Sequence, residues 1–285
     1  MLNIYQIYYN EESMKGIERQ FIPFNNTTPV KEKEFEYGVM RNLYLDGLLF
    51  NNKAKYAGVL SWKFRQKTGI NDTIFTEWIN KHKGYDVYFV NPWPEHSCMS
   101  FNSWYQGEYF HPGLIELTGK LFKKAGFDID IRNIRNTFKT LCFCNYFVAN
   151  KEFWDVYMSY CEKVYEAIYN TNEEYKKLLF DVKADEYIDS AFFAFIMERM
   201  FPTVLALEEL KILNYYDINS AKQKHPSLKI ILDKVYPLIA DIDKNKEYTQ
   251  DNIELINSIG RLYHDRIFNK FTSYEDYVCS SIIKI

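Results

Sequence analysis

Short apolar runs alternate with segments of helical periodicity in the first part of the chain. Residues 2–9, 56–61 and 86–92 are rich in Val, Ile and aromatic side chains and end at polar or turn residues, which is typical of buried strands. Between them, residues 33–46 and 72–82 carry apolar positions at helical spacing. Strands that alternate with helices predict an α/β protein whose right-handed crossovers build a mostly parallel sheet.

The remaining pattern predicts further helices and one more strand. Residues 112–126 begin with Pro112, carry an apolar stripe and end at Gly126, which predicts a helix. Residues 138–150 form an apolar run that we interpret as one buried strand, followed by a helix over residues 152–170. Residues 187–200 and 252–271 also have helical periodicity.

The chain therefore divides into an α/β part and a helical extension. We place the boundary near residue 205, which gives a domain over residues 1–205 and a helical C-terminal extension over residues 206–285. No repeat or Gly/Ser-rich linker marks this boundary. The extension has helical periodicity that would suit covering the sheet, recognising an acceptor or forming a dimer.

Composition limits the classes of function. The 285 residues are 47% hydrophobic and 26% charged, with a net charge of −3, so a globular fold is expected and a nucleic-acid partner is not. No run approaches the roughly 18 apolar residues of a membrane span, and the N-terminus lacks a signal-peptide pattern, which favours the cytoplasm. The five cysteines follow no zinc spacing, which favours buried thiols in a reducing compartment: Cys98, Cys142, Cys144, Cys161 and Cys279.

The stretch YAGVLSWKFRQKTG places cations at the end of a buried strand. Ser61 ends the strand and would cap a short helix over residues 62–68, which Gly69 would end. Lys63 and Lys67 are spaced i, i+4 and share one face of that helix. A helix start at the carboxyl end of a strand offers amide hydrogens to an anion, which predicts a phosphate site. The alternative is an ordinary solvated helix.

Polar residues also surround the third strand. Asp86 begins it, and Asn91, Glu95 and His96 follow its end, where an active-site loop belongs in an α/β protein. Prolines on both sides of Trp93 stiffen this loop. A surface loop without a ligand explains the same residues.

Three further groups carry candidate chemistry. Glu108 and His111, spaced i, i+3, suit a metal or acid/base role, or else helix capping and packing. Asp128 and Asp130 form a possible divalent-metal clamp for a diphosphate, although carboxylates are common in loops after helices. The densest acidic group leads into a helix that also contains Glu198 and would supply a general base or simply cap the helix: Asp185, Glu186 and Asp189.

Several of these segments together resemble a known family. GVLSWKF, QGEYFHPGL, NYFVANKEFWDVYM and IDSAFFAFIMERMF are similar to segments of glycosyltransferase-like proteins of bacterial capsule and lipopolysaccharide biosynthesis. The resemblance covers residues 1–205. It implies a GT-A-like (Rossmann-like) fold that moves a sugar from a nucleotide-sugar to a glycan or lipid-linked acceptor, in the cytoplasm or at the inner face of the membrane with peripheral membrane association.

The α/β alternation, the cationic helix start and the resemblance together predict roles for residues. The donor site comprises Ser61, Lys63, Lys67, Asp86, Asn91 and Asn145. The acceptor side contains Glu108 and His111, and the catalytic base is Asp185, Glu186 or Asp189. GT-A enzymes usually carry an Asp-X-Asp motif after a mid-sheet strand, and DVYFVNPWPEH has none, so use of Mn²⁺ or Mg²⁺ stays open, with Asp128 and Asp130 as candidate ligands. The alternative function is a non-catalytic scaffold of the same fold that binds a glycan or a partner.

Overall fold

Six short strands form one mixed sheet in the computed structural model, which describes residues 1–184, 191–224 and 229–268. The strand order is β2-β1-β3-β5-β4-β6. β1 pairs in parallel with β2 and β3, β4 pairs in parallel with β6, and β5 runs antiparallel between β3 and β4. The strand bounds are Leu2–Tyr8 (β1), Ile22–Asn25 (β2), Tyr56–Ser61 (β3), Val87–Phe89 (β4), Phe147–Asn150 (β5) and Ile212–Asn214 (β6). The predicted α/β class is confirmed, and the sheet is mixed, because β5 runs antiparallel to both of its neighbours.

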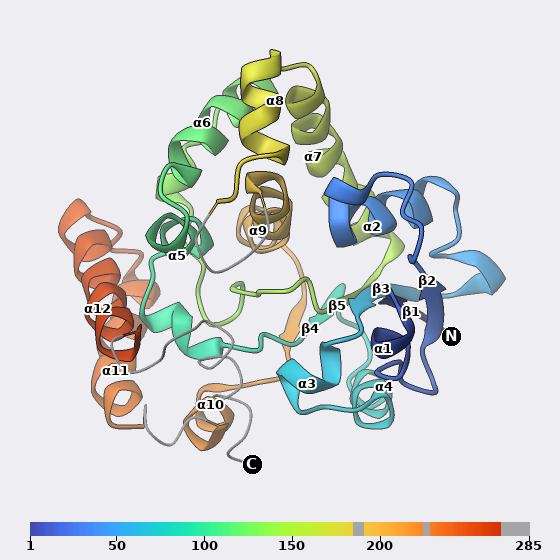
Figure 1. The fold of residues 1–285 in the computed structure, drawn as a ribbon. Coiled ribbons are helices and arrows are strands. Elements are labelled where there is room, and N and C mark those ends of the chain that lie inside the picture. Colours follow the sequence, from blue (N-terminus) through green and yellow to red (C-terminus); the bar gives the residue numbers. More distant parts are fainter. Residues whose placement is uncertain (185–190, 225–228, 269–285) are drawn as a thin grey trace.

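Helices cover both faces of this sheet (Figure 1). One face packs against α2 (Phe35–Leu45), α7 (Lys151–Tyr169) and α9 (Phe192–Leu207), with α5 (Ser103–Phe110), α6 (Leu114–Lys124) and α8 (Glu173–Phe180) extending the same core. The other face packs against α3 (Phe64–Thr68) and α4 (Asp72–Lys81). The short α1 (Glu11–Met14) follows β1.

Successive side chains of each strand point to opposite faces of the sheet, which produces these two cores. In β1, Tyr5 and Ile7 point into the larger core, and Ile4 points into the smaller one. In β5, Phe147 faces the larger core and Val148 the smaller one. Full burial of a large apolar side chain stabilises the fold by about 1.5–3 kcal/mol, which fixes the register of each strand.

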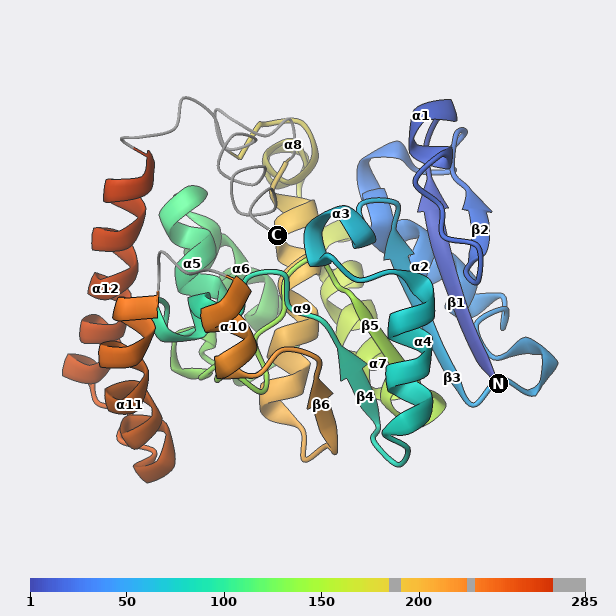
Figure 2. The same ribbon diagram turned by 90° about the horizontal axis from the view of Figure 1, so that it is seen from below.

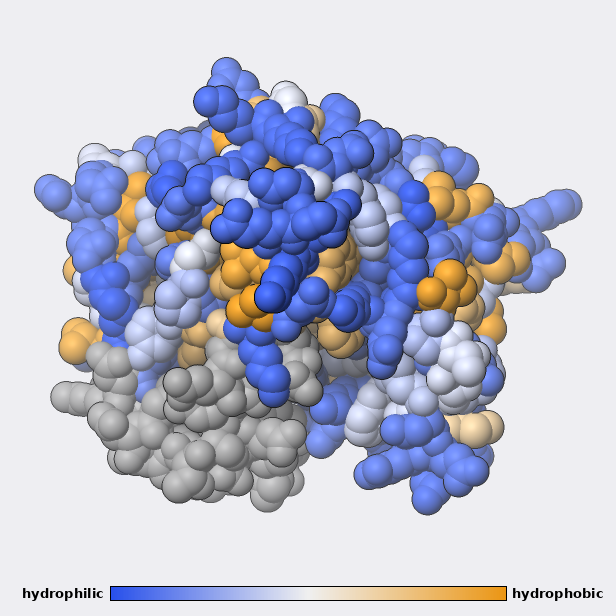
Figure 3. All heavy atoms as spheres, turned by 45° about the horizontal axis from the view of Figure 1, so that its top comes forward, coloured by the Kyte–Doolittle hydropathy of each residue, from blue (hydrophilic) through white to orange (hydrophobic). Residues whose placement is uncertain are grey.

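The last helices form a separate layer. α11 (Lys229–Asn245) and α12 (Gln250–Phe268) lie at the end of the molecule opposite β1 and β2 (Figures 1 and 2). Together with α10 (Ile218–Lys224) they pack on the short 3-10 helix η3 (Pro94–Cys98) through a core of their own. No helix in the described part of the chain is long and apolar enough to cross a membrane. On the face shown in Figure 3, hydrophilic side chains predominate and apolar ones form small groups.

Three sequence predictions need correction. The apolar run 138–150 is not one strand, because only Phe147–Asn150 pair with neighbours, and the left-handed residues Cys144 and Asn145 interrupt the extended backbone before them. The helix predicted from residue 62 begins at Phe64. The boundary at residue 205 falls inside α9, and β6 beyond it belongs to the sheet, so the C-terminal segment is not purely helical.

Candidate functional site

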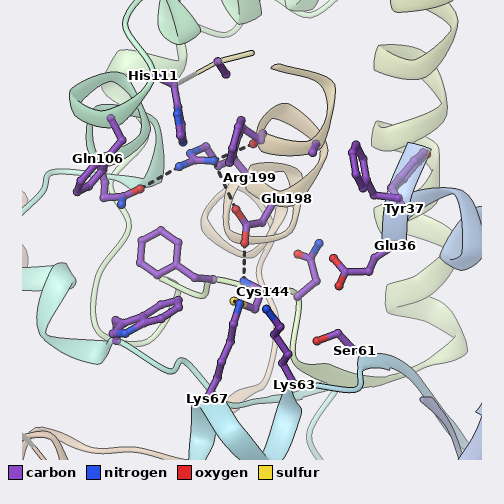
Figure 4. Close-up of a pocket in the computed structure, with 18 of the residues that line it drawn as sticks. Glu36, Tyr37, Ser61, Lys63, Lys67, Gln106, His111, Cys144, Glu198 and Arg199 are labelled. Atoms are coloured by element: carbon purple, nitrogen blue, oxygen red, sulfur yellow. Dashed lines mark hydrogen bonds and ion pairs between the residues drawn. The ribbon is translucent and has the colours of Figure 1, made fainter. Parts of the chain in front are cut away.

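A cavity of about 1150 Å³ opens where the parallel strands β1 and β3 end (Figure 4). The loops after these strands, the start of α2, the turn before β5 and one side of α9 line it. Because β5 is antiparallel, its amino end meets the carboxyl ends of its neighbours, so the turn before it reaches the same place. The lining residues used below are Ser61, Lys63, Lys67, Glu36, His111, Asn145, Glu198 and Arg199.

Two lysines enter the cavity from the segment after β3. Figure 4 shows Lys63 and Lys67 extending from the same side toward the middle of the cavity. The exposed Lys63 ammonium lies 5.2 Å from the Trp62 ring centroid. The Lys67 ammonium donates a hydrogen bond to Cys144 Sγ at 3.2 Å. Burial raises the pKa of the Cys144 thiol to about 11, although Lys67 opposes this shift, so Lys67 contacts a neutral thiol.

Glu36 enters the cavity from the first turn of α2. Its partly buried carboxylate points toward the middle of the cavity and makes no hydrogen bond or ion pair with another described residue (Figure 4). Loss of water raises the pKa of this carboxyl above its usual value; nearby Glu198 adds to the rise, whereas Lys67 and Lys63 oppose it. The site therefore holds a carboxylate that binds a proton more readily than one in water.

The buried carboxylate of Glu34, two residues before Glu36, fixes the position of Glu36. Glu34 is 4% exposed and accepts hydrogen bonds from Tyr165 Oη, at 2.7 Å, and from Tyr169 Oη, and it pairs with Lys31 at 3.0 Å. Gly38 makes room for it, because a Cβ at this position would lie 2.9 Å from Glu34 Cβ. This explains a glycine inside a helix, where it otherwise weakens the helix.

Phe35 lies between Glu34 and Glu36 in the chain. Its backbone has φ 49°, a conformation that non-glycine residues rarely adopt. The fixed Glu34 on one side and helix α2 on the other hold it there.

The turn before β5 is also held in an unusual conformation. Cys144 and Asn145 both have positive φ, at 65° and 52°. The Cys144 amide donates a hydrogen bond to Glu198 Oε1 at 2.8 Å, which ties the turn to α9. Asn145 is 7% exposed, and its Oδ1 has no hydrogen-bond partner among the described residues. A buried amide oxygen of this kind is costly unless something else donates to it.

Arg199 on α9 is a buried residue that holds Glu198 in position. Its guanidinium is 3% exposed and donates to Ser103 O at 2.8 Å, Phe195 O at 3.0 Å and Gln106 Oε1 at 2.9 Å. Its Nη1 also lies 3.5 Å from Glu198 Oε2. Arg199 thus fixes the carboxylate that in turn fixes the Cys144 turn.

His111 forms part of the cavity wall near Arg199. Its ring is 4% exposed and stacks on Phe195, with 3.7 Å between ring centroids. Burial, reinforced by Arg199, lowers the pKa of His111 to about 3, although a hydrogen bond with the Ala184 backbone opposes the shift. The imidazole is therefore neutral near pH 7 and contributes an aromatic surface.

No protein-family model, curated protein or solved structure matches this chain. The chemistry of the cavity is therefore interpreted from its own residues.

The structure brings together seven residues that the sequence singled out. These residues are Ser61, Lys63, Lys67, His96, His111, Asn145 and Glu198. Ser61 does end β3, but its hydroxyl shares a hydrogen bond with Tyr146 Oη at 3.0 Å and does not cap α3. Gly69 ends α3 in the predicted left-handed conformation, with φ 74°.

Other predicted site residues lie apart from the cavity. Asp86 directly precedes β4, at the amino end of this strand, where it accepts hydrogen bonds from Asn150 Nδ2, at 2.9 Å, and from the Lys211 amide, at 2.8 Å. Asn91 is buried and accepts from the Trp93 amide at 3.1 Å. Neither side chain lines the cavity: Asp86 connects β4 to the ends of β5 and β6, and Asn91 holds the turn at Trp93.

Glu108 has the capping role that was the alternative for it. Its carboxylate accepts from the Gly113 amide at 2.8 Å and the Ile115 amide at 2.7 Å, at the start of α6. It does not line the cavity with His111.

The acidic pair Asp128 and Asp130 is exposed in the loop after α6, and Asp130 caps the next turn through the Arg132 amide at 2.9 Å. Among the described residues, no group of three or more His, Cys, Asp or Glu side chains could hold a metal ion. The predicted bases Asp185, Glu186 and Asp189 lie outside the described residues.

Two residues of the site were not assigned from the sequence. Glu36 lies in a segment read only as a helix, and Arg199 in one read as an apolar helix. A charged residue within an otherwise apolar helix, as in FIMERMF, is the signal that could have identified Arg199.

Proposed function

We propose that this protein is a GT-A-like glycosyltransferase that transfers a sugar from a nucleotide-sugar to a hydroxyl group of a glycan or lipid-linked acceptor. The single observation that carries the proposal is the charge arrangement of the cavity: Lys63 and Lys67 face Glu36 and Glu198 across it (Figure 4). Its position at the carboxyl ends of the parallel strands is where ligands bind in open α/β sheets. The resemblance of residues 1–205 to surface-polysaccharide enzymes supports the same function and a site of action at the inner face of the membrane.

The two lysines suit the leaving group. When the bond between the sugar and the phosphate breaks, negative charge develops on the nucleotide. Ammonium groups already placed beside it stabilise that charge without reorganisation. Lys63 and Lys67 take this role in the proposed reaction.

Glu36 suits the proton transfer. The acceptor oxygen bonds to the anomeric carbon as the nucleotide leaves with the bonding electrons, and the hydroxyl proton passes to the carboxylate. A general base works best when its pKa lies close to the working pH, and loss of water moves the pKa of Glu36 in that direction. Glu198 is less suited, because the Cys144 amide and Arg199 already occupy its oxygens.

A binding screen tests the proposal. The full chain is heated in the presence of UDP, GDP, CMP or dTDP and their sugars, each with and without Mn²⁺ or Mg²⁺. Selective binding raises the melting temperature, and release of the nucleotide from the bound donor then measures turnover. No shift with any nucleotide would contradict the proposal and favour a scaffold that binds a glycan or a partner.

Lys63→Ala is expected to weaken binding of the donor about tenfold, as loss of one charge-assisted contact to phosphate does. The side chain is exposed and makes no ion pair with a described residue, so the melting temperature without ligand should not change. Isothermal titration with the selected nucleotide gives the dissociation constant. Lys151→Ala, whose side chain on α7 is 60% exposed, is the matched control. Equal affinity in the two variants would remove Lys63 from the phosphate site.

A further inference from the structure

We infer that Glu36, Asn145 and Glu198 form a subsite for a sugar ring without a carboxylate, a neutral hexose or an amino sugar, and that this subsite excludes uronic and sialic acid rings. The inference rests on the proposed function and specifies its donor. It starts from the part of the cavity that the two lysines face, where Glu36 and Glu198 lie (Figure 4).

Asn145 indicates that a hydrogen-bond donor belongs at this subsite. Its Oδ1 is buried and has no partner among the described residues, although the residue lines the cavity. An amide oxygen accepts hydrogen bonds and does not donate them. A hydroxyl or amino group of a bound ring would satisfy it, whereas a carboxylate would place another acceptor against it.

The backbone around Asn145 supports a specific role for this side chain. Two consecutive non-glycine residues with positive φ cost on the order of 1–3 kcal/mol each and persist only where the surroundings enforce them. Here the Glu198 carboxylate holds the Cys144 amide, and Arg199 holds Glu198. The fold thus fixes the one conformation that directs Asn145 to the cavity.

The charges near Asn145 indicate what kind of ring fits. Glu36 and Glu198 are close enough to interact electrostatically, and Lys67 and Lys63 also act on Glu36. With both ammonium groups paired with the donor phosphates, a third carboxylate beside Glu36 and Glu198 would be repelled. Arg199 does not offset them for a ligand, because its buried guanidinium is directed at three oxygens of the protein and at Glu198. Lys63 and Lys67 are assigned to the phosphates.

A matched pair of donors tests the inference. UDP-glucose and UDP-glucuronic acid differ only by a carboxylate at C6, and GDP-mannose with GDP-mannuronic acid, or dTDP-glucose with dTDP-glucuronic acid, is the same comparison for another base. Titration of the full chain with the pair that carries the preferred nucleotide is expected to give at least tenfold tighter binding of the neutral sugar.

Two variants test whether charge at the subsite causes the discrimination against the uronic acid. Glu198→Gln keeps an oxygen for the Cys144 amide but removes the charge, and Asn145→Asp adds a charge at the subsite. Discrimination against the uronic acid should fall about tenfold or more in the first and rise in the second. Glu173→Gln, whose side chain on α8 is 89% exposed, is the control and should leave the ratio unchanged.

The outcomes separate the two proposals. If no nucleotide binds, the glycosyltransferase function is wrong and the sugar subsite with it. If the nucleotide binds but the two sugars of the pair bind equally, or if CMP and CMP-sialic acid are preferred, only the subsite is wrong. An unchanged ratio in both variants would also overturn it.

Discussion

Glu36→Gln is expected to reduce nucleotide release from the selected donor by about 100-fold or more, the usual effect of removing a general base, while nucleotide affinity changes little. Glutamine keeps the size of the side chain but cannot accept the proton of the acceptor hydroxyl. The measurement is kcat with saturating donor, with a glycan or water as acceptor, together with the dissociation constant of the nucleotide. Unchanged kcat would show that Glu36 is not the base.

The pH profile distinguishes a base from a residue that only shapes the cavity. The unprotonated carboxylate is the active form, so kcat should rise with pH through the pKa of Glu36, which desolvation moves above the usual range for glutamate. In Glu36→Gln this acid limb should disappear. A limb that persists in the variant would assign the base to another group, with Asp185, Glu186 and Asp189 as the first to substitute.

The same substitution should stabilise the protein near neutral pH. The pKa of Glu36 is higher in the folded state than in the unfolded state, so the folded state binds more protons between the two values and stability falls as pH rises through that window. The loss of stability caused by the ionised Glu36 is then present at pH 7 and absent below the pKa that Glu36 has in the unfolded state. Thermal unfolding of Glu36→Gln should therefore show a higher melting temperature than the parent at pH 7 and no difference at pH 3.

Local pattern predicted the parts of the fold that have strong local signals. β1 and β3 are short, mostly apolar runs, and β3 spans the predicted residues 56–61. β2 and β6 were not predicted, because β2 contains Pro23 and is mostly exposed, and β6 is three partly buried residues. Short edge strands of this kind are defined by pairing with neighbours and not by their own sequence.

The residues of the candidate site likewise divide into those with a local signal in the sequence and those placed by contacts with distant residues. Lys63 and Lys67 follow β3 in the sequence, so the position of the strand predicted where they would lie. Asn145 was assigned through the resemblance, inside a run interpreted as one strand, and it lies in the turn before β5. Glu36 follows Glu34 by two residues, and Glu34 is held by Tyr165, 131 residues away. Arg199 depends on Ser103, 96 residues away. Contacts over such distances leave no periodicity or spacing in the sequence.

Gly107→Ala is expected to destabilise the protein by about 3 kcal/mol, the upper range for an overpacked core, and to reduce turnover as well. A Cβ at this position would lie 2.4 Å from Arg199 Nε, 2.7 Å from Arg199 Cζ and 2.4 Å from Leu114 Cδ2. Arg199 cannot move aside cheaply, because its donors are bound to three protein oxygens. A displaced guanidinium would leave a buried charge without these partners, which is itself costly.

The loss of activity follows from the chain of contacts behind the cavity. Arg199 holds Glu198, Glu198 holds the Cys144 amide, and that turn holds Asn145. Gly107→Ala should therefore lower the melting temperature by about 6–10 °C and weaken sugar binding even at temperatures where the variant is fully folded. Gly119→Ala on α6 is the matched control: a Cβ there meets nothing within 4 Å, so the change should stabilise the helix by about 0.5–1 kcal/mol. A Gly107→Ala variant with full stability but weak sugar binding would place the defect in the cavity alone, whereas full stability and full binding would show that Arg199 does not position the site.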